Sequence, residues 1–341
     1  LVVDNVAKGA SIGGVRMAPD VTTEECARLA RAMTFKNAAA GLPHGGGKAI
    51  LVGDPKMPSA QKEILIRGFA CALKEVEQYI FAPDMGTNEE CMAWVKDEIE
   101  RVVGLPREVG GIPLDEIGAT GCGLSHVVDE TLKFCDFTID SARVAVQGFG
   151  AVGKHASRFL NNQGAIIVAV SDSRGTIFNA NGLDIDTLSA IKAEGKSVTE
   201  YPDGERRDCE DIIDIECEIW IPAARPDVIH DDNVHRLNTR LLVEGANIPV
   251  TPGAEKILSD KGVICVPDFI ANAGGVICAA MEYQGASQTA AMATIEEKLR
   301  RNTIEVLQTA KDEQVLPREA AITMARKRID RAMSFCRWNL F

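Results

Sequence analysis

The chain has 341 residues and a formal net charge of −12, with 46% hydrophobic and 25% charged residues. This length predicts two domains, and this composition is typical of a globular protein. The negative charge argues against a nucleic-acid or membrane partner, and no apolar run reaches the length of a membrane span. No signal peptide is visible, but the chain opens on Leu1-Val2-Val3 rather than Met, so we expect that a preceding segment is missing.

The ten cysteines are scattered along the chain. None forms a C-x-x-C pair or a Cys/His cluster at metal-ligand spacing, so no metal site is predicted. Several, such as Cys265 and Cys278, lie in apolar runs. This pattern is typical of buried thiols in a reducing compartment, and we expect a cytoplasmic protein.

Strands and helices alternate in the first part of the chain, which predicts an α/β layer. In order, we expect a strand at 1–5, a glycine turn at 10–16, a helix at 22–40, a strand at 48–52, a helix at 59–78, a strand at 79–82 and a helix from 87 to about 101. Two pairs, Thr22 with Glu25 and Thr87 with Glu90, have the spacing of capping boxes that begin helices.

Two lysines stand out here. Lys36 lies on an apolar helical run, and Lys48 follows three glycines at 45–47, which would let the backbone approach a bound molecule. The pKa of a lysine falls readily when the ammonium is desolvated. A phosphate-binding P-loop is excluded, because Leu42 and Ala49 stand where it requires Gly and Ser or Thr. We interpret the stretch as a lysine site for a small anionic or carbonyl substrate; two surface lysines around a loop are the alternative.

A Gly- and Pro-rich stretch at 102–117 predicts a hinge between domains. We expect a first domain over 1–115, completed by C-terminal helices at 290–341, and a second domain over 116–289. A helix from 120 to about 134 leads into the second domain. A cleft between the two domains is the expected place for a substrate.

The second domain contains a G-x-G-x-x-G turn, formed by Gly148, Gly150 and Gly153. A strand precedes this turn, a helix follows it over 152–160, and Asp172 lies 19 residues beyond its last glycine at the end of the next strand. This context is that of a dinucleotide-binding site, in which the glycines admit the pyrophosphate and the acid accepts from a ribose hydroxyl. A glycine turn that only packs a helix on a sheet is the alternative.

Further strand-like runs at 218–221, 241–244 and 263–266 each end in small or polar residues. These turns are Pro222-Ala223-Ala224, Gly245-Ala246-Asn247 and Pro267-Asp268. A doubly wound parallel sheet binds its ligand at the carboxyl ends of its strands, so we expect the turns to face a nucleotide. A helix from about 274 to 283 and two more, at 291–310 and 317–333, complete the predicted elements.

At this point the sequence resembles the glutamate/leucine/phenylalanine/valine dehydrogenases over nearly its whole length. The motifs that carry the resemblance are Gly13-Gly14-Val15-Arg16, Met33-Thr34-Phe35-Lys36-Asn37, Gly45-Gly46-Gly47-Lys48, Pro83-Asp84-Met85-Gly86-Thr87-Asn88, Ala119-Thr120-Gly121, Gln147-Gly148-Phe149-Gly150, Glu244-Gly245-Ala246-Asn247 and Asn272-Ala273-Gly274-Gly275. The resemblance implies a substrate-binding and oligomerisation domain followed by a Rossmann-type nucleotide domain. It also implies an enzyme that converts an L-amino acid to the 2-oxo acid and ammonia.

The resemblance implies catalytic roles for three residues. Lys36 would hold the substrate α-carboxylate, and Lys48 would activate water and stabilise the carbinolamine. Asp84 would exchange protons with the amino nitrogen as a general acid/base. A turn aspartate without catalytic role is the alternative for Asp84.

The resemblance also implies which residues bind the ligands. The substrate site would comprise Lys36, Gly13, Gly14, Ile12, Ala279 and Val276. The cofactor site would comprise Thr120, Gly148, Phe149, Gly150, Ala151, Val152, Gly153, Asp172, Ser173, Ala223, Ala224, Asn247 and Asn272. NAD is the expected cofactor because Asp172 would repel a 2′-phosphate; NADP is the alternative, since Ser173 and Arg174 could receive one.

The substrate is expected to be an apolar amino acid. Family members that use glutamate have a lysine before the first Gly-Gly and a hydroxyl residue four positions after the last one. This chain has Ile12 and Ala279 there, which cannot pair with a carboxylate. A glutamate enzyme whose side-chain anchor is displaced to Arg16 or His44 is the alternative. A catalytically silent nucleotide-binding homologue is a further alternative, and a hexamer or octamer of identical subunits is expected.

Overall fold

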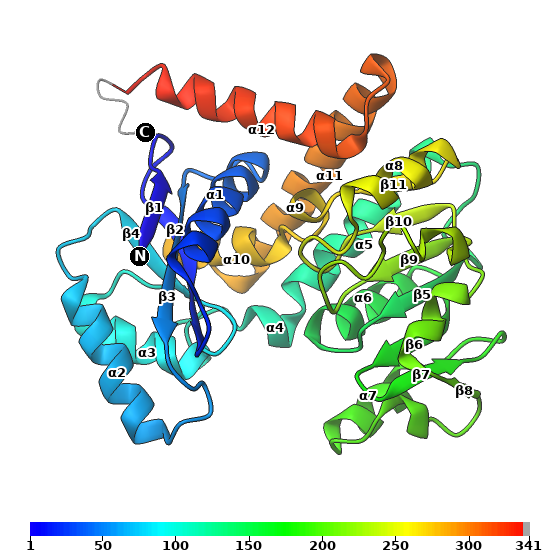
Figure 1. Cartoon of the computed structure of the whole chain (residues 1–341), viewed down its shortest axis with the longest axis horizontal. Coiled ribbons are helices and arrows are strands. Elements are labelled where there is room, and N and C mark those ends of the chain that lie inside the picture. Colours follow the sequence, from blue (N-terminus) through cyan, green and yellow to red (C-terminus); the bar gives the residue numbers. More distant parts are fainter. Residues whose placement is uncertain (337–341) are drawn as a thin grey trace. The chain divides into compact units, whose positions relative to one another are not determined.

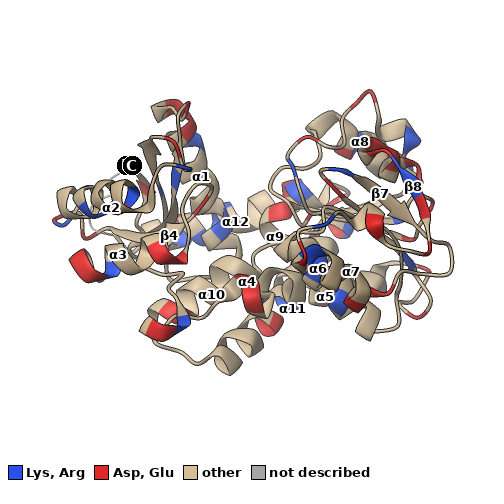
Figure 2. Cartoon of the chain, turned by 90° about the horizontal axis from the view of Figure 1, so that it is seen from below, with Lys and Arg blue, Asp and Glu red and all other residues tan. Residues whose placement is uncertain are grey.

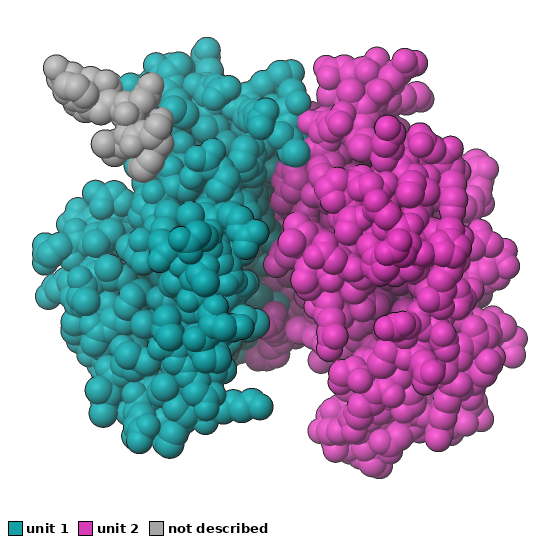
Figure 3. Space-filling model, viewed as in Figure 1, with its two compact units in different colours: residues 1–114, 275–295, 322–341 teal, residues 115–274, 296–321 magenta. Residues whose placement is uncertain are grey.

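The structure is a computed structural model that describes residues 1–336. The chain divides into two compact units (Figure 3). Unit 1 comprises residues 1–114, 275–295 and the chain from Ile322 onwards; unit 2 comprises 115–274 and 296–321. Among the described residues, no helix is long and apolar enough to cross a membrane. Charged residues of both signs are spread over the helices of each unit (Figure 2).

The compact units differ from the expected domain bounds in the C-terminal part. The segment 275–295 belongs to unit 1, because Glu282 accepts hydrogen bonds from the backbone N–H groups of Leu105 (3.1 Å) and Ile112 (2.8 Å). The segment 296–321 belongs to unit 2, where Arg300 pairs with Glu130 at 2.8 Å. Side-chain bonds between residues distant in the sequence, which no local pattern reveals, therefore hold these segments to their units.

Unit 1 is built on a four-stranded sheet of order β1-β3-β2-β4 (Figure 1). The strands are β1 (Val2–Asn5), β2 (Ser11–Ala18), β3 (Gly45–Val52) and β4 (Tyr79–Pro83). β1 is antiparallel to β3, whereas β2 runs parallel to both β3 and β4. The expectation of a glycine turn at 10–16 is wrong: Gly13 and Gly14 are strand residues. A Cβ at Gly13 would lie 1.8 Å from the carbonyl oxygen of Gly47, so glycine is required by close strand packing.

The helices of unit 1 cover the faces of this sheet or pack on another helix. They are α1 (Thr23–Ala39), α2 (Ser59–Ala72), α3 (Glu89–Ile99) and most of α10 (Gly274–Tyr283) and α12 (Pro317–Met333). Through Arg328, which donates to the carbonyls of Ala38 and Ala39, α12 packs on α1. Thr22 caps α1 as expected, accepting from the backbone N–H of Glu25 at 3.1 Å. The cap of α3 is Asn88 and not the expected Thr87, because Asn88 accepts from the N–H of Cys91 at 3.0 Å.

The pleat of the sheet separates a core face from a face that carries the candidate site. Val15, Ala49 and Phe81 lie in the core cluster with residues of α2 and α3. Because successive side chains alternate, the neighbouring even-numbered residues point to the opposite face. By the strand register these are Ile12, Gly14 and Arg16 on β2, Gly46 and Lys48 on β3, and Ile80 and Ala82 on β4. We call this the even face; α1 packs on it, since a Cβ at Gly46 would touch Thr34.

Unit 2 contains a seven-stranded sheet of order β11-β10-β9-β5-β6-β7-β8. The strands are β5 (Arg143–Gln147), β6 (Ile166–Asp172), β7 (Gly175–Phe178), β8 (Glu205–Arg207), β9 (Ile219–Pro222), β10 (Leu241–Val243) and β11 (Ile264–Val266). The five strands from β11 to β6 are parallel, and β7 and β8 are antiparallel additions at one edge. The strand order reverses between β5 and β9, which is where a doubly wound sheet binds its ligand.

Helices cover both faces of this sheet (Figure 1). They are α5 (Ala119–Thr131), α6 (Ala151–Asn162), α7 (Ile185–Ala193), α8 (Pro252–Asp260), α9 (Asp268–Ala271) and α11 (Gln288–Glu313), with the short α4 (Leu114–Ile117) at the boundary. Short 3-10 helices occur in unit 2 at Leu132–Phe134, Val198–Glu200, Cys209–Asp214 and Val234–Arg236, and in unit 1 at Arg107–Val109. Gly121 lets α5 and α6 approach closely, since a Cβ there would lie 2.6 Å from the backbone nitrogen of Ala156.

Candidate active site

Lys48, which is buried, and Asp84, which is half-buried, form an ion pair on the even face of unit 1. Lys48 stands in β3 and is 5% exposed, and its Nζ donates to Oδ2 of Asp84, the residue directly after β4. Arg16 of β2 donates from Nε to the other oxygen, Oδ1, at 3.3 Å. Three adjacent strands therefore bring one carboxylate and two cations together, a set that can exchange protons with a bound molecule.

The turn after β4 holds the Asp84 side chain in place. The backbone N–H of Met85 donates to Asp84 Oδ1 at 2.6 Å. Thr87 Oγ1 accepts from the N–H of Asp84 at 3.0 Å and donates to the carbonyl of Val15 at 2.8 Å. Thr87, which the sequence pattern placed at a helix start, instead ties the turn that carries Asp84 to strand β2. Its position three residues after an aspartate was the available signal.

Gly14 is a requirement of the ion pair. A Cβ at this position would lie 2.7 Å from the Cβ of Asp84 and 2.9 Å from its Oδ2. The glycine triplet 45–47 has a different purpose from the one expected, because it lies within β3 and packs against neighbouring chain segments. A Cβ at Gly45 would meet Asn5, and one at Gly47 would meet Ser11.

The electrostatic environment lowers the pKa of Lys48 to about 7. Burial is the main cause, and the positive charges of Arg16 and Lys36 add to it. Lys36 is a half-buried residue in the last turn of α1. Arg16 is shared with Glu25 of α1 at 2.5 Å. A lysine with this pKa can change protonation state near neutral pH.

The residues expected to line the side-chain pocket lie on β2 and α10 of unit 1. Ile12 is 1% exposed and shares the even face with Lys48, whereas Ala279 is 6% exposed on α10. His44 connects these two elements. Its Nδ1 lies 3.1 Å from the carbonyl oxygen of Ala10, and its ring packs edge-on against Tyr283, one helical turn after Ala279, at 5.8 Å.

His44 and Tyr283 are two groups in this part of unit 1 that the expected set of Ile12, Ala279 and Val276 lacks. Burial lowers the pKa of His44, so its imidazole favours the neutral form. Within residues 1–336, His44 Nε2 is buried and has no hydrogen-bond partner. Val276, by contrast, is only partly buried on α10.

The three glycines of the turn after β5 have distinct environments. Gly148 has a φ of +97° and lies against Ala223 and Ala224 after β9, with a would-be Cβ 2.6 Å from that of Ala224. A Cβ at Gly153 would lie 1.8 Å from the carbonyl oxygen of Gly148. No atom lies within 4 Å of a Cβ at Gly150, where α6 begins. This turn has the form that admits a pyrophosphate at a helix N-terminus.

The neighbours of this turn differ in exposure. Phe149 is buried, Ala151 and Ser173 are exposed, and Val152 is partly buried. These residues surround the beginning of α6 and the end of β6, where we expected them to face the cofactor.

Asp172 ends β6 as expected, but its acceptor capacity is already used by the chain. Oδ1 accepts from the N–H of Arg174 (2.9 Å) and the hydroxyl of Ser197 (2.9 Å). Oδ2 accepts from Lys192 Nζ (2.8 Å) and the N–H of Val198 (3.0 Å). Four donors fill the roughly four lone-pair positions of a carboxylate, so a ribose hydroxyl would have to displace one of them.

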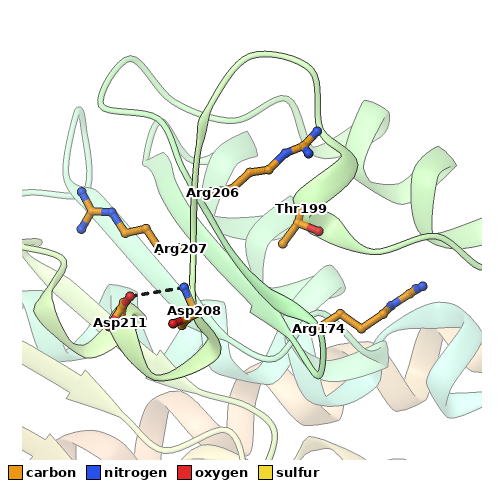
Figure 4. Close-up of a pocket in the computed structure, with 6 residues that line it drawn as sticks. All are labelled: Arg174, Thr199, Arg206, Arg207, Asp208 and Asp211. Atoms are coloured by element: carbon orange, nitrogen blue, oxygen red, sulfur yellow. Dashed lines mark hydrogen bonds between the residues drawn. The ribbon is translucent and has the colours of Figure 1, made fainter.

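A hollow beside Asp172 is lined by arginines (Figure 4). The lining residues are Arg174, Thr199, Arg206, Arg207, Asp208 and Asp211. Arg207 is paired with Glu205 at 2.9 Å, and Arg174 donates to the carbonyl of Gly195 at 2.8 Å. Arg206 is exposed and takes part in no ion pair among the described residues. Only Arg174 was singled out by the sequence, because the others lie 25 or more residues later, in β8 and in the 3-10 helices on either side of it.

Asn272 connects the turns after β10 and α9. Its Nδ2 lies within hydrogen-bond distance of Asn247 Oδ1 (3.0 Å) and of the carbonyls of Gly245 (3.3 Å) and Ala246 (3.2 Å). Thr120 of α5 adjoins the same region, since a Cβ at Gly274 would lie 3.1 Å from its Cα. The structure therefore brings Thr120, Asn247 and Asn272 into one part of unit 2. No group of three or more His, Cys, Asp or Glu residues within 1–336 could hold a metal ion.

Two family models match the chain. Residues 2–101 match the model described as Glu/Leu/Phe/Val dehydrogenase, dimerisation domain. Residues 110–336 match the model described as Glutamate/Leucine/Phenylalanine/Valine dehydrogenase. Together they cover nearly all of the chain.

Relatives and solved structures agree with these matches. A glutamate dehydrogenase of Aeropyrum pernix is 37% identical, covering 98% of this chain and 85% of the relative. One from Thermotoga maritima is 40% identical, covering 83% and 71%. The hetero-hexameric glutamate dehydrogenase of Thermus thermophilus superposes with a TM-score of 0.87 and 31% identity, covering 96% of this chain and 82% of that one.

The L-tryptophan dehydrogenase of Nostoc punctiforme, at 22% identity and a TM-score of 0.74 over 96% of this chain and 90% of its own, shares the fold. The matches confirm the resemblance drawn from the motifs and the two-domain α/β fold with a Rossmann-type nucleotide domain. The chain belongs to the glutamate/leucine/phenylalanine/valine dehydrogenase family and is an NAD(P)-dependent amino acid dehydrogenase.

Proposed function

We propose that Lys36, Lys48 and Asp84 carry out the reversible oxidative deamination of an L-amino acid. The observation that supports this most directly is the Lys48–Asp84 pair, with a Lys48 pKa of about 7 beside two further cations. Lys36 binds the α-carboxylate. Asp84 takes the proton of the amino group, so that the nitrogen lone pair can form the iminium as hydride leaves Cα.

Lys48 acts on the second half of the reaction. In its neutral form it accepts a proton from water, which adds to the iminium carbon to give the carbinolamine. Asp84 returns its proton to the nitrogen and, as the C–N bond breaks and ammonia departs, accepts the proton of the carbinolamine hydroxyl, so that the 2-oxo acid remains. The nicotinamide nucleotide, when bound, accepts the hydride and its electron pair. The groups that would hold it are the glycine turn at 148–153 and the turns carrying Ala223, Asn247 and Asn272.

L-Glutamate is the first candidate substrate. Relatives that are 36–40% identical over most of their length bear the name glutamate dehydrogenase. A glutamate side chain requires a second cationic anchor, and Ile12 and Ala279 provide none. His44, whose buried Nε2 is without a partner within 1–336, would have to take up a proton when the γ-carboxylate binds.

An apolar amino acid of the leucine, valine or phenylalanine type is the second candidate. The buried, uncharged side chains of Ile12 and Ala279 favour it, because a carboxylate buried without a partner costs several kcal/mol. The relatives' names support glutamate better than an apolar amino acid. The apolar substrate is favoured only by Ile12 and Ala279.

The test is the initial rate of NAD and NADP reduction with glutamate, leucine, valine, phenylalanine and tryptophan at alkaline pH. Higher kcat/KM with glutamate, lost in His44→Leu but kept in the control His235→Leu, would establish the displaced anchor. Higher kcat/KM with an apolar amino acid would contradict glutamate as the substrate. In that case Ile12→Lys should shift activity toward glutamate. No turnover with any substrate, at intact nucleotide binding, would indicate a silent homologue.

For the cofactor, we propose that NADP is used in addition to NAD. Asp172 is neutralised by Lys192, and Arg174 and Arg206 offer donors to a 2′-phosphate in the adjoining hollow. The experiment compares kcat/KM for the two cofactors in wild type, Arg206→Ala and the control Arg301→Ala. Arg206→Ala should lower the value for NADP about tenfold and leave NAD unchanged. An equal effect on both cofactors would contradict the assignment.

We propose, finally, that the chain forms an oligomer of identical subunits through unit 1, in a cytoplasmic setting. Residues 2–101 match a model described as a dimerisation domain. Ile64 is 74% exposed on α2, which fits a covered face. All ten cysteines are free thiols, as in a reducing compartment. Light scattering after size exclusion would measure the mass, and a monomer would contradict the proposal.

A further inference from the structure

Arg318, in the first turn of α12, lies at the centre of a buried carboxylate cluster in unit 2. Its Nε donates to Glu255 Oε2 at 2.7 Å, and its Nη1 donates to Asp268 Oδ1 at 3.0 Å. Its Nη2 contacts both oxygens of Glu244 at 2.8 Å. Each guanidinium nitrogen thus holds a different carboxylate, a geometry that the planar arginine fork allows and a lysine ammonium cannot reproduce.

The partners of Arg318 stand at the bases of two turns. Glu244 directly follows β10 and precedes Gly245-Ala246-Asn247, whereas Asp268 begins α9, which ends before Asn272. Glu244 Oε2 also accepts from the N–H of Asp268 at 3.1 Å. Arg318 therefore holds Glu244 and Asp268 together. These two residues begin the short segments that end at Asn247 and Asn272.

A second link runs directly into the asparagine turn. Asp268 Oδ2 accepts from the N–H of Ile248 at 2.9 Å, next to Asn247. Ile248 has a φ of +44°, a left-handed conformation that a β-branched residue adopts only when its surroundings enforce it. The hydrogen bond that the N–H of Ile248 donates to Asp268, whose carboxylate is oriented by Arg318, is one such constraint. The cluster thus determines the backbone path around Asn247.

The asparagine pair carries an independent sign of a ligand. Asn272 is 4% exposed, and its Oδ1 has no hydrogen-bond partner among the described residues, although its Nδ2 has three acceptors nearby. A buried acceptor left without a donor is costly, so a donor from a bound molecule is expected there. In a doubly wound sheet the half of the dinucleotide beyond the pyrophosphate turn lies over the β9–β10 side.

We propose that Arg318 is a positioning residue: through Glu244 and Asp268 it holds the Asn247–Asn272 pair where Asn272 accepts from the carboxamide N–H of a bound nicotinamide. The inference rests on the proposed nucleotide site but assigns a role to a residue outside it. A purely structural ion cluster would affect folding and both halves of the nucleotide site alike. A positioning residue would affect the nicotinamide half alone.

The experiment titrates wild type, Arg318→Lys and the control Arg301→Lys with reduced nucleotide and with ADP-ribose, which lacks nicotinamide. Arg301 lies on the neighbouring helix α11 in an exposed pair with Glu297. Arg318→Lys should weaken binding of the reduced nucleotide about tenfold to a hundredfold, in line with a misplaced contact group. Its dissociation constant for ADP-ribose, and both constants of the control, should stay within about twofold.

Asn272→Ala and the double variant complete a thermodynamic cycle. If Arg318 acts through Asn272, the double variant should bind the reduced nucleotide no more weakly than Asn272→Ala alone. Additive losses, an equal loss of ADP-ribose binding, or unchanged binding in folded Arg318→Lys would each overturn the inference. Should Arg318→Lys fail to fold, Asp268→Asn loosens the same clamp and takes its place, with the same expected results. A wild-type chain that binds ADP-ribose but no reduced nucleotide would refute the nicotinamide site itself.

Discussion

The two units each bury a cluster of charges, and the clusters have opposite balances. On the even face of unit 1, Arg16 and Lys48 both contact Asp84, Arg16 also pairs with Glu25, and the positive charge of Lys36 acts on Lys48. In unit 2, the single cation Arg318 faces Glu244, Glu255 and Asp268. One cluster has cations in excess, and the other has carboxylates in excess.

The imbalance has different consequences in the two units. The excess of cations lowers the pKa of Lys48, and a substrate carboxylate would restore the balance, so the unit 1 cluster is incomplete without an anion. In unit 2, each guanidinium nitrogen already has an acceptor, and the excess negative charge is relieved because the pKa of Glu244 is raised to about 8 by burial. The first cluster is suited to chemistry, and the second to holding a shape.

The largest expected effect comes from breaking the unit 1 pair. Lys48→Ala or Asp84→Asn should lower kcat by about 10²- to 10⁴-fold, the contribution typical of a general acid or base. Binding of the nucleotide, whose groups lie in unit 2, should remain nearly unchanged by fluorescence titration. Lys62→Ala, a lysine on α2 that donates to Pro55, serves as the control. Loss of nucleotide binding in either variant would show that the site is misplaced.

A smaller effect is expected from disturbing the pair without removing it. Gly14→Ala would place a Cβ 2.7 Å from that of Asp84, so the carboxylate must move away from Lys48. A displacement on this scale should lower kcat by about 10- to 100-fold. Gly68→Ala, in α2, is the matched control because no atom lies within 4 Å of its Cβ. Wild-type turnover in Gly14→Ala would argue against a fixed Asp84.

The sequence carried more information about unit 2 than about the surroundings of Asp84. The strand–turn–helix pattern at 148–153 can be recognised locally, since Gly153 packs on the carbonyl of Gly148 within the same segment, although Gly148 itself lies against Ala223 and Ala224 after the distant strand β9. The role of Gly14 depends on a contact 70 residues away in the chain, and that of Thr87 on a carbonyl of β2. Nothing in the local pattern distinguishes such a strand glycine from a turn glycine, which is why 10–16 was misinterpreted.

The same limit applies to charge. Asp172 stands where the pattern predicts, but its availability depends on Lys192 and Ser197, which come from a later helix and turn. Arg318 had no motif at all, because its three partners are 50 to 74 residues distant. The sequence predicts which residues stand at the end of a strand. Whether their polar atoms are already hydrogen-bonded or are free for a ligand can be seen only in the folded chain.

The pH dependence of turnover probes how the unit 1 cluster tunes Lys48. Neutral Lys48 is the proposed base, so kcat/KM for deamination should rise with pH through an apparent pKa near 7 and then level off. Glu25 raises the Lys48 pKa, so Glu25→Gln should shift this limb to lower pH, while the neighbouring control Glu24→Gln should not. A shift to higher pH in Glu25→Gln would contradict the electrostatic account.

The smallest expected effect is a change in stability from the unit 2 cluster. The pKa of Glu244 is raised from an ordinary value near 4.5 to about 8, so between these values the folded chain holds a proton that the unfolded chain releases. The stability that this proton contributes is present at low pH and is lost as pH rises through 8. Glu244→Gln cannot ionise, so its Tm relative to wild type should increase between pH 5 and 8.5, on the order of 2–4 °C. A difference in Tm that stays constant or falls over this range would mean that Arg318 keeps Glu244 ionised, and that the cluster retains its full negative excess.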